Sequence, residues 1–133
     1  LKEQCTGRVL GVDVGGVEMP GAVILATGGF ERNDSLCRSF LRGPVAAPAG
    51  VPTAQGDGLR MAMGAGAMLG NMSEAWWCPA IQIPGEVIDS APLYRLLQAE
   101  RTHPGSIMID SGGRRFVNEA QNYNDFLQMN CNE

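Results

Sequence analysis

The stretch Pro104–Tyr123, PGSIMIDSGGRRFVNEAQNY, is the most informative part of the chain, because it combines a hairpin pattern with a dense set of polar groups. Ser106–Asp110 is rich in residues that favour β-strands, and Ser111-Gly112-Gly113 can supply a turn that needs positive φ. A second short strand pattern follows the glycines. We therefore expect a hairpin over Ser106–Asn118 with a three-residue turn.

Polar side chains cluster at the end of this expected hairpin. Asn118, Glu119 and Tyr123 lie where a sheet edge gives way to a loop or helix, which is a usual place for binding groups on a rigid support. The alternative is that Arg114, Arg115 and Glu119 are solvated strand-end charges and that Tyr123 only packs against its neighbours. The residue pattern alone leaves both interpretations open.

The composition indicates a folded protein that acts on a small molecule. The chain has 133 residues, of which 44% are hydrophobic and 18% are charged, and this is typical of a globular chain. The length suits one domain but is short for an enzyme that holds both a large cofactor and a substrate. A net charge of −4 and the absence of a basic run argue against nucleic acid or an anionic membrane surface as the main partner.

The cysteines do not predict a metal site. No CxxC pair occurs, and the chain has a single histidine, so we expect no metal ligands. We expect reduced thiols and a cytoplasmic protein, because nothing resembles a signal peptide. No apolar run approaches the ~20 residues of a membrane helix. The four cysteines are widely scattered at Cys5, Cys37, Cys78 and Cys131.

Apolar runs predict two strands in the first part of the chain. Gly7–Val14 alternates apolar with small or polar residues, as a strand does. Ala22–Ala26, AVILA, is a continuous apolar run, which predicts a central strand buried on both faces. Thr27-Gly28-Gly29 follows at once, so that backbone can approach a ligand closely there. The glycines also suit a simple tight turn, and the two interpretations are compatible.

Two helices are expected next. Asn33–Leu41 has apolar residues at helical spacing, with Asn33 or Asp34 as the cap. Leu59–Leu69 is rich in alanine and methionine, which favour a helix. Asp57 precedes this second helix between glycines, at a point where polar ligand groups can meet backbone N–H donors. Asp57 can equally serve only as a helix cap.

The second part of the chain begins with a pair of indoles. Trp76 and Trp77 stand just before Pro79, where they can line an apolar pocket or fill a seam between domains. Ala80–Val87 has the pattern of an extended segment, and Ala91–Glu100 is weakly helical in pattern.

Four blocks together resemble a known family of flavoproteins. The blocks are AVILATGGF, TAQGDGLRMAMGAGAML, EAWWCPA and PGSIMIDSGGRRFVNEAQNY, in this order. They resemble the fumarate reductase and 3-ketosteroid dehydrogenase superfamily, and the steroid dehydrogenase branch in particular. The resemblance implies a mixed α/β (α+β) fold: part of an FAD-binding domain of the glutathione-reductase-like type over residues 1–78, and the beginning of a substrate (cap) domain over residues 79–133.

The resemblance also implies that the chain is an internal segment of a longer protein. Members of the family are several times longer, begin with a glycine-rich FAD fingerprint, and end with a further part of the FAD domain. We therefore expect FAD as the cofactor of the whole protein. For this segment alone we expect self-association, and weak or absent binding of FAD.

The resemblance implies roles for single residues. Ala26, Thr27 and Gly28 match a strand end that runs beside FAD, and Asp57 matches an acidic residue associated with FAD binding. Tyr123 matches a catalytic tyrosine that lies over the flavin and takes a proton from the steroid.

The resemblance further implies an FAD-dependent desaturation beside a ketone, with proton abstraction and hydride transfer to the flavin. Trp76, Trp77 and Asn118 are the candidate contacts to an apolar, steroid-like substrate. Fumarate reductases are similar up to Asn118-Glu119 but carry an arginine in place of Tyr123, and a His-Pro-Thr where this chain has Trp-Cys-Pro-Ala. A fumarate reductase-like protein and a non-catalytic binding module are the alternatives.

Overall fold

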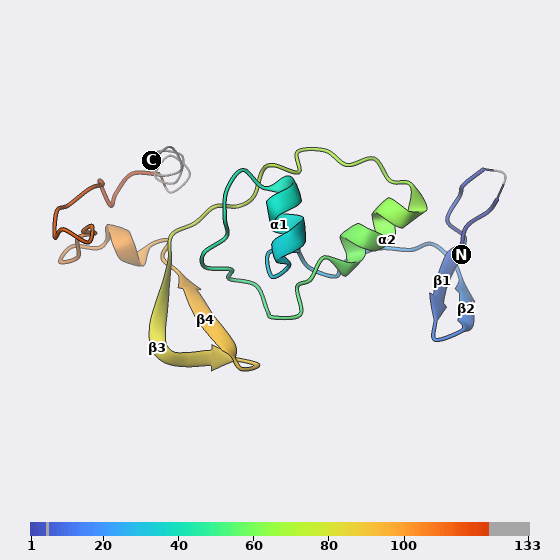
Figure 1. Cartoon of the computed structure of the whole chain (residues 1–133), viewed down its shortest axis with the longest axis horizontal. Helices are drawn as coiled ribbons and strands as arrows, with labels where there is room; N and C mark the ends of the chain where they lie inside the picture. The colour runs from blue at the N-terminus through green and yellow to red at the C-terminus, as the bar shows by residue number, and fades with distance from the viewer. Residues whose placement is uncertain (5, 123–133) are drawn as a thin grey trace.

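The computed structural model describes residues 1–4 and 6–122 of the chain, and these form two small antiparallel sheets and short helices (Figure 1). The hairpins lie on either side of a middle region that holds the two α-helices. The elements are β1 Gly11–Val14, β2 Val17–Pro20, α1 Asp34–Phe40, α2 Asp57–Ala65, β3 Ala80–Ile88, β4 Ala91–Leu96 and a 3₁₀ turn Glu100–Thr102.

The strand expected over Gly7–Val14 is regular only from Gly11 onward, where it forms β1. Gly15 and Gly16 have φ of 62° and 86°, a combination that a type I′ hairpin turn requires. The chain therefore turns back as β2, with Val14 opposite Val17. The glycines that interrupt the strand pattern are the turn of a hairpin that the sequence analysis did not predict.

The expectation of a central buried strand over residues 22–26 is wrong for this chain. Ile24 is 90% exposed, and Val23 and Leu25 are also among the exposed large apolar residues. A strand needs a neighbour for its backbone N–H and C=O groups, and no strand in the described part of the chain pairs with this segment.

Helix α1 confirms the predicted helix and resolves its cap. The Asn33 side-chain oxygen accepts a hydrogen bond from the Leu36 N–H at 3.0 Å, so Asn33 and not Asp34 is the N-cap. Cys37 faces inward and is 6% exposed. The rings of Phe30 and Phe40 meet edge to face, with centroids 6.0 Å apart, and this contact ties the helix to the loop before it.

Helix α2 begins two residues before the expected start and ends four before the expected end. Gly66 adopts φ of 87° and stops the helix. Its N–H donates to the Met63 carbonyl, and the Ala67 N–H donates to the Ala62 carbonyl, both at 2.9 Å. These two bonds form a Schellman motif. Gly66, which the sequence analysis placed inside the helix, is therefore the residue that ends it.

The strand β3 confirms the extended segment, whereas the helical interpretation of Ala91–Glu100 is wrong because β4 occupies its first part. Asp89 and Ser90 have φ of 47° and 65°, so they form a tight turn of the type that favours hairpins. This turn places Ala91 opposite Ile88. Pairing with β3 therefore overrides a weak helical pattern.

The hairpin expected over residues 106–118 is reduced to one bridge, between Ile109 and Arg115. The turn itself is confirmed: Gly113 has φ of 75°, and its N–H donates to the Asp110 carbonyl at 3.0 Å. An Asp110 carboxylate oxygen accepts from the Gly112 and Arg114 N–H groups at 2.8 and 2.9 Å. Side-chain bonds of Asp110 thus replace most of the expected strand ladder.

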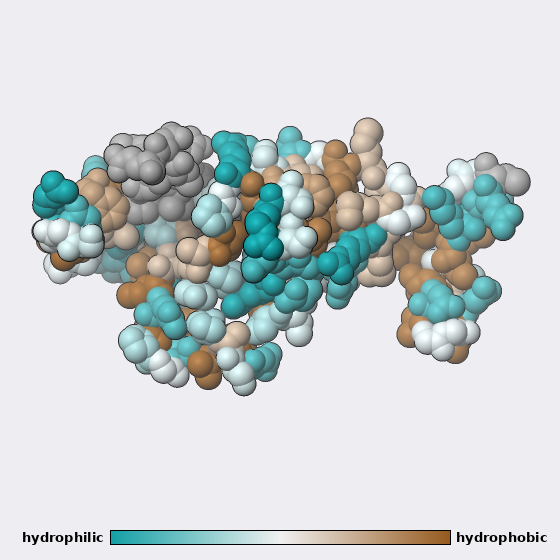
Figure 2. All heavy atoms as spheres, in the orientation of Figure 1, coloured by the Kyte–Doolittle hydropathy of each residue, from teal (hydrophilic) through white to brown (hydrophobic). Residues whose placement is uncertain are grey.

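The chain buries little of its apolar surface. Its accessible surface is 9639 Å², whereas a compact monomer of 14.1 kDa is expected to expose about 6,700 Å². Figure 2 shows hydrophobic residues on the visible face of both hairpins and of the middle region. Cys37 and Ala54 are the buried hydrophobic residues of the described part. In that part, no helix is long and apolar enough to cross a membrane.

Candidate cofactor and substrate site

The loop that follows residues 22–26 lies against the beginning of α2. The Gly56 N–H donates to the Gly29 carbonyl at 3.1 Å. A Cβ atom added to Gly58 would lie 2.2 Å from Thr27 Oγ1, so the two segments touch at this point. The structure therefore brings Thr27 and Gly28 next to the helix start that carries Asp57.

Gly56 makes this contact possible. Its φ is 84°, a backbone conformation that side chains rarely adopt. A Cβ atom there would lie 2.5 Å from Leu36 Cδ1 and 2.8 Å from Phe30 Cβ. The beginning of α2 can approach α1 and the loop only because this position has no side chain.

The predicted cofactor residues form an open polar edge. Ala26, Thr27, Gly28 and Asp57 are all exposed. Within the described residues, the Asp57 carboxylate accepts no side-chain hydrogen bond and forms no ion pair. A helix start leaves its first N–H groups without partners inside the helix, and a free carboxylate accepts hydrogen bonds from hydroxyl groups. This edge can therefore hold a ligand that is rich in hydroxyl and other polar groups.

The predicted substrate residues lie in the other part of the chain. Trp76 is 67% exposed and Trp77 is half-buried. Asn118 is exposed, and its side-chain oxygen accepts a hydrogen bond from the Ala120 N–H at 3.1 Å. The predicted catalytic residue, Tyr123, lies outside the described residues.

Glu119 contradicts the interpretation as a solvated charge, because it is 6% exposed, whereas Arg114 and Arg115 are exposed as that interpretation expects. Its carboxylate accepts from the Met108 N–H at 2.7 Å and from Arg115, whose Nε lies 3.1 Å from Oε2. The Arg115 guanidinium and then the Met108 N–H lower the pKa of Glu119 from 4.5 to about 2. Glu119 is therefore ionised throughout the physiological pH range and fastens two stretches of chain together.

Arg101 is a buried residue that the sequence analysis missed. It is 7% exposed, and its guanidinium donates to the Glu119 carbonyl and, at 2.7 Å, to the Gln121 carbonyl. An arginine in a polar stretch carries no signal of such burial, so single-sequence reasoning could not find it. The pair of Arg115 and Glu119 could have been suspected from their spacing of four residues.

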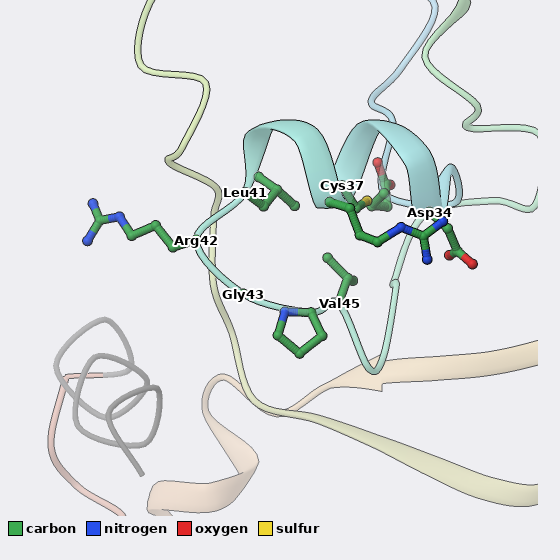
Figure 3. A pocket seen from close by; sticks show the side chains of 9 residues that line it. Asp34, Cys37, Leu41, Arg42, Gly43 and Val45 are labelled. Carbon is green, nitrogen blue, oxygen red and sulfur yellow. The ribbon is translucent and has the colours of Figure 1, made fainter.

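Two cavities lie away from the predicted site residues. One, of about 490 Å³, runs along α1 and the loop after it; Figure 3 shows Cys37, Leu41 and Val45 around it, and Arg42 pointing away. The other, of about 460 Å³, lies between β1 and α2 and is lined by Val23 and Leu25 among others. Neither is lined by Thr27, Asp57, Trp76 or Asn118.

Comparison with known proteins decides the family. The family described as FAD binding domain matches residues 2–132. This chain belongs to the FAD-binding domain family. The polar edge formed by Thr27, Gly28 and Asp57 thus lies in a chain whose family binds FAD, and a ligand with many hydroxyl groups suits that edge.

The chain has relatives among dehydrogenases and reductases. It is 46% identical over 125 residues to 4-oxocyclohexanecarboxylate 2-dehydrogenase of Sinomonas cyclohexanicum, which covers 92% of this chain and 22% of the relative. It is 38% identical over 103 residues to 3-oxosteroid 1-dehydrogenase of Mycobacterium tuberculosis, over 76% and 17% of the two chains. Fumarate reductase (cytochrome) of Shewanella frigidimarina is 36% identical over 101 residues, which cover 74% of this chain and 16% of the relative.

A solved structure matches nearly the whole chain. The crystal structure of 3-ketosteroid delta1-dehydrogenase from Sterolibacterium denitrificans, in complex with 1,4-androstadiene-3,17-dione, has a TM-score of 0.75 and 36% identity. The match covers 99% of this chain and 24% of the solved chain. The resemblance to ketosteroid dehydrogenases and fumarate reductase flavoproteins is confirmed. The chain spans about a fifth of the length of these relatives.

Proposed function

We propose that the whole protein is an FAD-dependent oxidoreductase that introduces a double bond next to a ring ketone. The observation that carries this proposal is the match of 99% of the chain, with a TM-score of 0.75 and 36% identity, to a ketosteroid dehydrogenase. The reaction is a dehydrogenation of a CH–CH bond. The open shape of the chain is consistent with this, because the same arrangement occurs as one part of a larger enzyme.

In this proposal the polar edge holds part of FAD. Gly28 offers backbone that no side chain shields, since a Cβ atom there would meet nothing within 4 Å, and Thr27 precedes it at the same edge. The Asp57 carboxylate accepts hydrogen bonds from hydroxyl groups of the cofactor, and Ala26 ends the extended segment that leads to this edge. When bound, FAD supplies the acceptor of the hydride. The chain's own residues bind and orient the cofactor and the substrate.

Trp76, Trp77 and Asn118 contact the substrate in this proposal. An indole that is 67% exposed, as in Trp76, offers a large flat apolar surface, which a fused-ring ketone would cover. Asn118 begins a turn that the Gln121 N–H closes by donating to the Asn118 carbonyl at 3.0 Å. We assign residues 1–78 to the FAD-binding part and residues 79–133 to the beginning of the substrate part.

In this proposal the phenolate of Tyr123 takes the proton from the carbon next to the ketone and becomes the neutral phenol. With FAD bound, the flavin would accept the hydride from the adjacent carbon, and a carbon–carbon double bond would form between the two carbons. The substrate loses one hydrogen as a proton and one as a hydride, and these losses balance the new carbon–carbon double bond. A positioned proton acceptor typically contributes about 10²- to 10⁴-fold to such a step.

A 3-ketosteroid and a smaller ring ketone are the two candidate substrates. The structural match favours the steroid. The identity of 46% over 92% of the chain favours a ring of the size of 4-oxocyclohexanecarboxylate. Both contain a saturated carbon pair beside a ring ketone, so the proposed chemistry is the same.

Anaerobic flavin reduction in the whole protein tests the proposal. We expect a 3-ketosteroid or 4-oxocyclohexanecarboxylate to bleach the flavin absorbance within seconds, while succinate leaves it unchanged. Bleaching by succinate, or by none of the three in a protein that dithionite still reduces, would contradict the proposal. The faster of the two ketones identifies the substrate class.

A further inference from the structure

The turn 118–121 is held by several hydrogen bonds, and the one from Arg101 to the Glu119 carbonyl is buried. Within the turn, the Gln121 N–H donates to the Asn118 carbonyl at 3.0 Å. From outside it, Arg101 donates to the carbonyls of Glu119 and Gln121, so both ends of one guanidinium fork are used on this turn. A buried arginine that bonds two backbone carbonyls fixes their spacing, because the guanidinium plane is rigid.

A second anchor acts on the same turn from the side chain of Glu119. This carboxylate accepts hydrogen bonds from the Met108 N–H and from Arg115. Arg101 and Glu119 are 7% and 6% exposed, and they are the buried charged residues of the described part. Hydrogen bonds to charged groups away from water are stronger than exposed ones, so the turn is fastened at its backbone and at its side chain.

Arg101 also lies beside the segment that carries the tryptophans. Its charge acts on the Cys78 thiol, which is next to Trp77 and whose pKa is raised chiefly by burial. The Arg101 charge therefore acts on the end of the segment that carries Trp76 and Trp77, while its guanidinium bonds the turn 118–121. These are the two stretches to which the proposed function assigns the substrate contacts.

We propose that Arg101 is a positioning residue that holds the turn 118–121, and with it the proposed substrate contact Asn118, in one geometry for the reaction. The proposal rests on the proposed function for its catalytic consequence. The mechanical part, that Arg101 fixes the turn, stands on the hydrogen bonds alone.

Two variants distinguish a specific positioning role of Arg101 from an effect that any arginine substitution in this region would have. Arg101→Lys keeps the charge but replaces the rigid fork by a single ammonium group, which cannot bond both carbonyls in the same geometry. Arg114→Lys is the matched control, because Arg114 lies in the same region, has a side chain that is 85% exposed, and among the described residues forms an ion pair only with Asp110, at 3.3 Å. Both are made in the whole protein with its flavin.

Hydrogen exchange of the Gln121 amide tests the mechanical part without any substrate. This N–H closes the turn on the Asn118 carbonyl, so its exchange reports opening of the turn. We expect at least about 10-fold faster exchange in Arg101→Lys and no change in Arg114→Lys. Equal exchange in wild type and Arg101→Lys would overturn the proposal, whatever the protein catalyses.

Kinetics at matched flavin content test the catalytic consequence. We expect Arg101→Lys to lower kcat by about 10- to 100-fold with a smaller change in KM, because misplacement of reacting groups by about 1 Å has this scale of effect. Flavin content and absorption spectrum should stay as in wild type. Unchanged kcat despite faster exchange would overturn the positioning role, and so would loss of flavin or of folded protein in Arg101→Lys alone. A wild-type protein whose flavin no ring ketone reduces would contradict the proposed function. Hydrogen exchange of the Gln121 amide would then still test whether Arg101 fixes the turn.

Discussion

At the scale of single residues, Glu119 is the position where burial changes the chemistry most. An ordinary glutamate at the end of a hairpin would be solvated, whereas this one is 6% exposed and bonds Arg115 and Met108. Its pKa falls from 4.5 to about 2, with the Arg115 bond as the main cause. The carboxylate therefore stabilises the folded state above pH 4.5, and this contribution is lost as pH falls toward 2.

Glu119→Gln removes this titration. We expect the variant to melt at a lower temperature than wild type above pH 5, and the difference to shrink as pH falls from 4.5 to about 2, where wild type also loses its charge. Thermal melting of the whole protein at a series of pH values measures it. Glu18→Gln, on the exposed strand β2, serves as the control. A difference that stayed constant down to pH 2 would show that Glu119 is not held as an ion.

Tyr123 carries the proposed proton transfer. Tyr123→Phe keeps the ring but removes the hydroxyl, so we expect the flavin content and colour of the whole protein to remain. Flavin reduction by the ring ketone should slow by roughly 10²-fold or more. Stopped-flow absorbance at matched flavin content compares the two proteins. Equal rates would mean that Tyr123 only packs against its neighbours.

At the scale of elements, the sequence pattern predicted the helices and strands that are stabilised by their own residues. Helix α1 follows from its apolar spacing and its Asn33 cap, and β3 follows from its extended pattern. The run 22–26 was misjudged because burial of a strand depends on partners that its own residues do not encode. The strand β4 was missed because the turn at Asp89-Ser90, without glycine, gives little warning of positive φ.

The candidate site was predictable to a similar extent. The glycines around Thr27 and Asp57 suggest ligand contact separately, but nothing in their spacing says that the two segments touch. Their contact depends on Gly56, whose φ of 84° and tight packing against Phe30 appear only in three dimensions. Arg101 was invisible for the same reason, since its partners are backbone carbonyls, which every residue has.

Helix α2 offers a matched pair of glycines to test that contact. Gly56→Ala places a Cβ atom 2.5 Å from Leu36 Cδ1 at a positive φ, which costs about 1–2 kcal/mol for the backbone alone. We expect a lower melting temperature and weaker FAD retention in the whole protein. Gly64→Ala, inside helix α2 with nothing within 4 Å of the added Cβ atom, should cost nothing and add up to about 1 kcal/mol of helix propensity. Equal behaviour of the two variants would disprove the role of Gly56.

At the scale of the whole molecule, the surface of the chain is its most informative property. It exposes 9639 Å², about 2,900 Å² more than a compact chain of this mass is expected to expose. Large apolar residues such as Ile24 and Val17 are part of that surface. The unpaired backbone groups of an extended apolar segment can form hydrogen bonds with a strand of another chain, so exposed surface of this kind promotes association.

We therefore expect the 133-residue chain, expressed alone, to self-associate. Sedimentation at several concentrations should show species larger than a monomer, and FAD should be retained weakly or not at all, because one loop and one helix start cannot hold the whole cofactor. Ile24→Lys, which places a charge at a side chain that is 90% exposed, should reduce the association. A monomer at high concentration with a stoichiometric yellow cofactor would contradict both expectations.

The central claim is that the whole protein removes two hydrogens from a ring ketone and passes the electrons to FAD. Product analysis under anaerobic conditions tests it most directly: one equivalent of flavoprotein is mixed with a 3-ketosteroid or with 4-oxocyclohexanecarboxylate, and the ketone is analysed by mass spectrometry. We predict a product lighter by two hydrogen atoms, formed in proportion to the flavin that is bleached. Bleached flavin with an unchanged ketone, or an unsaturated product without bleached flavin, would contradict the account.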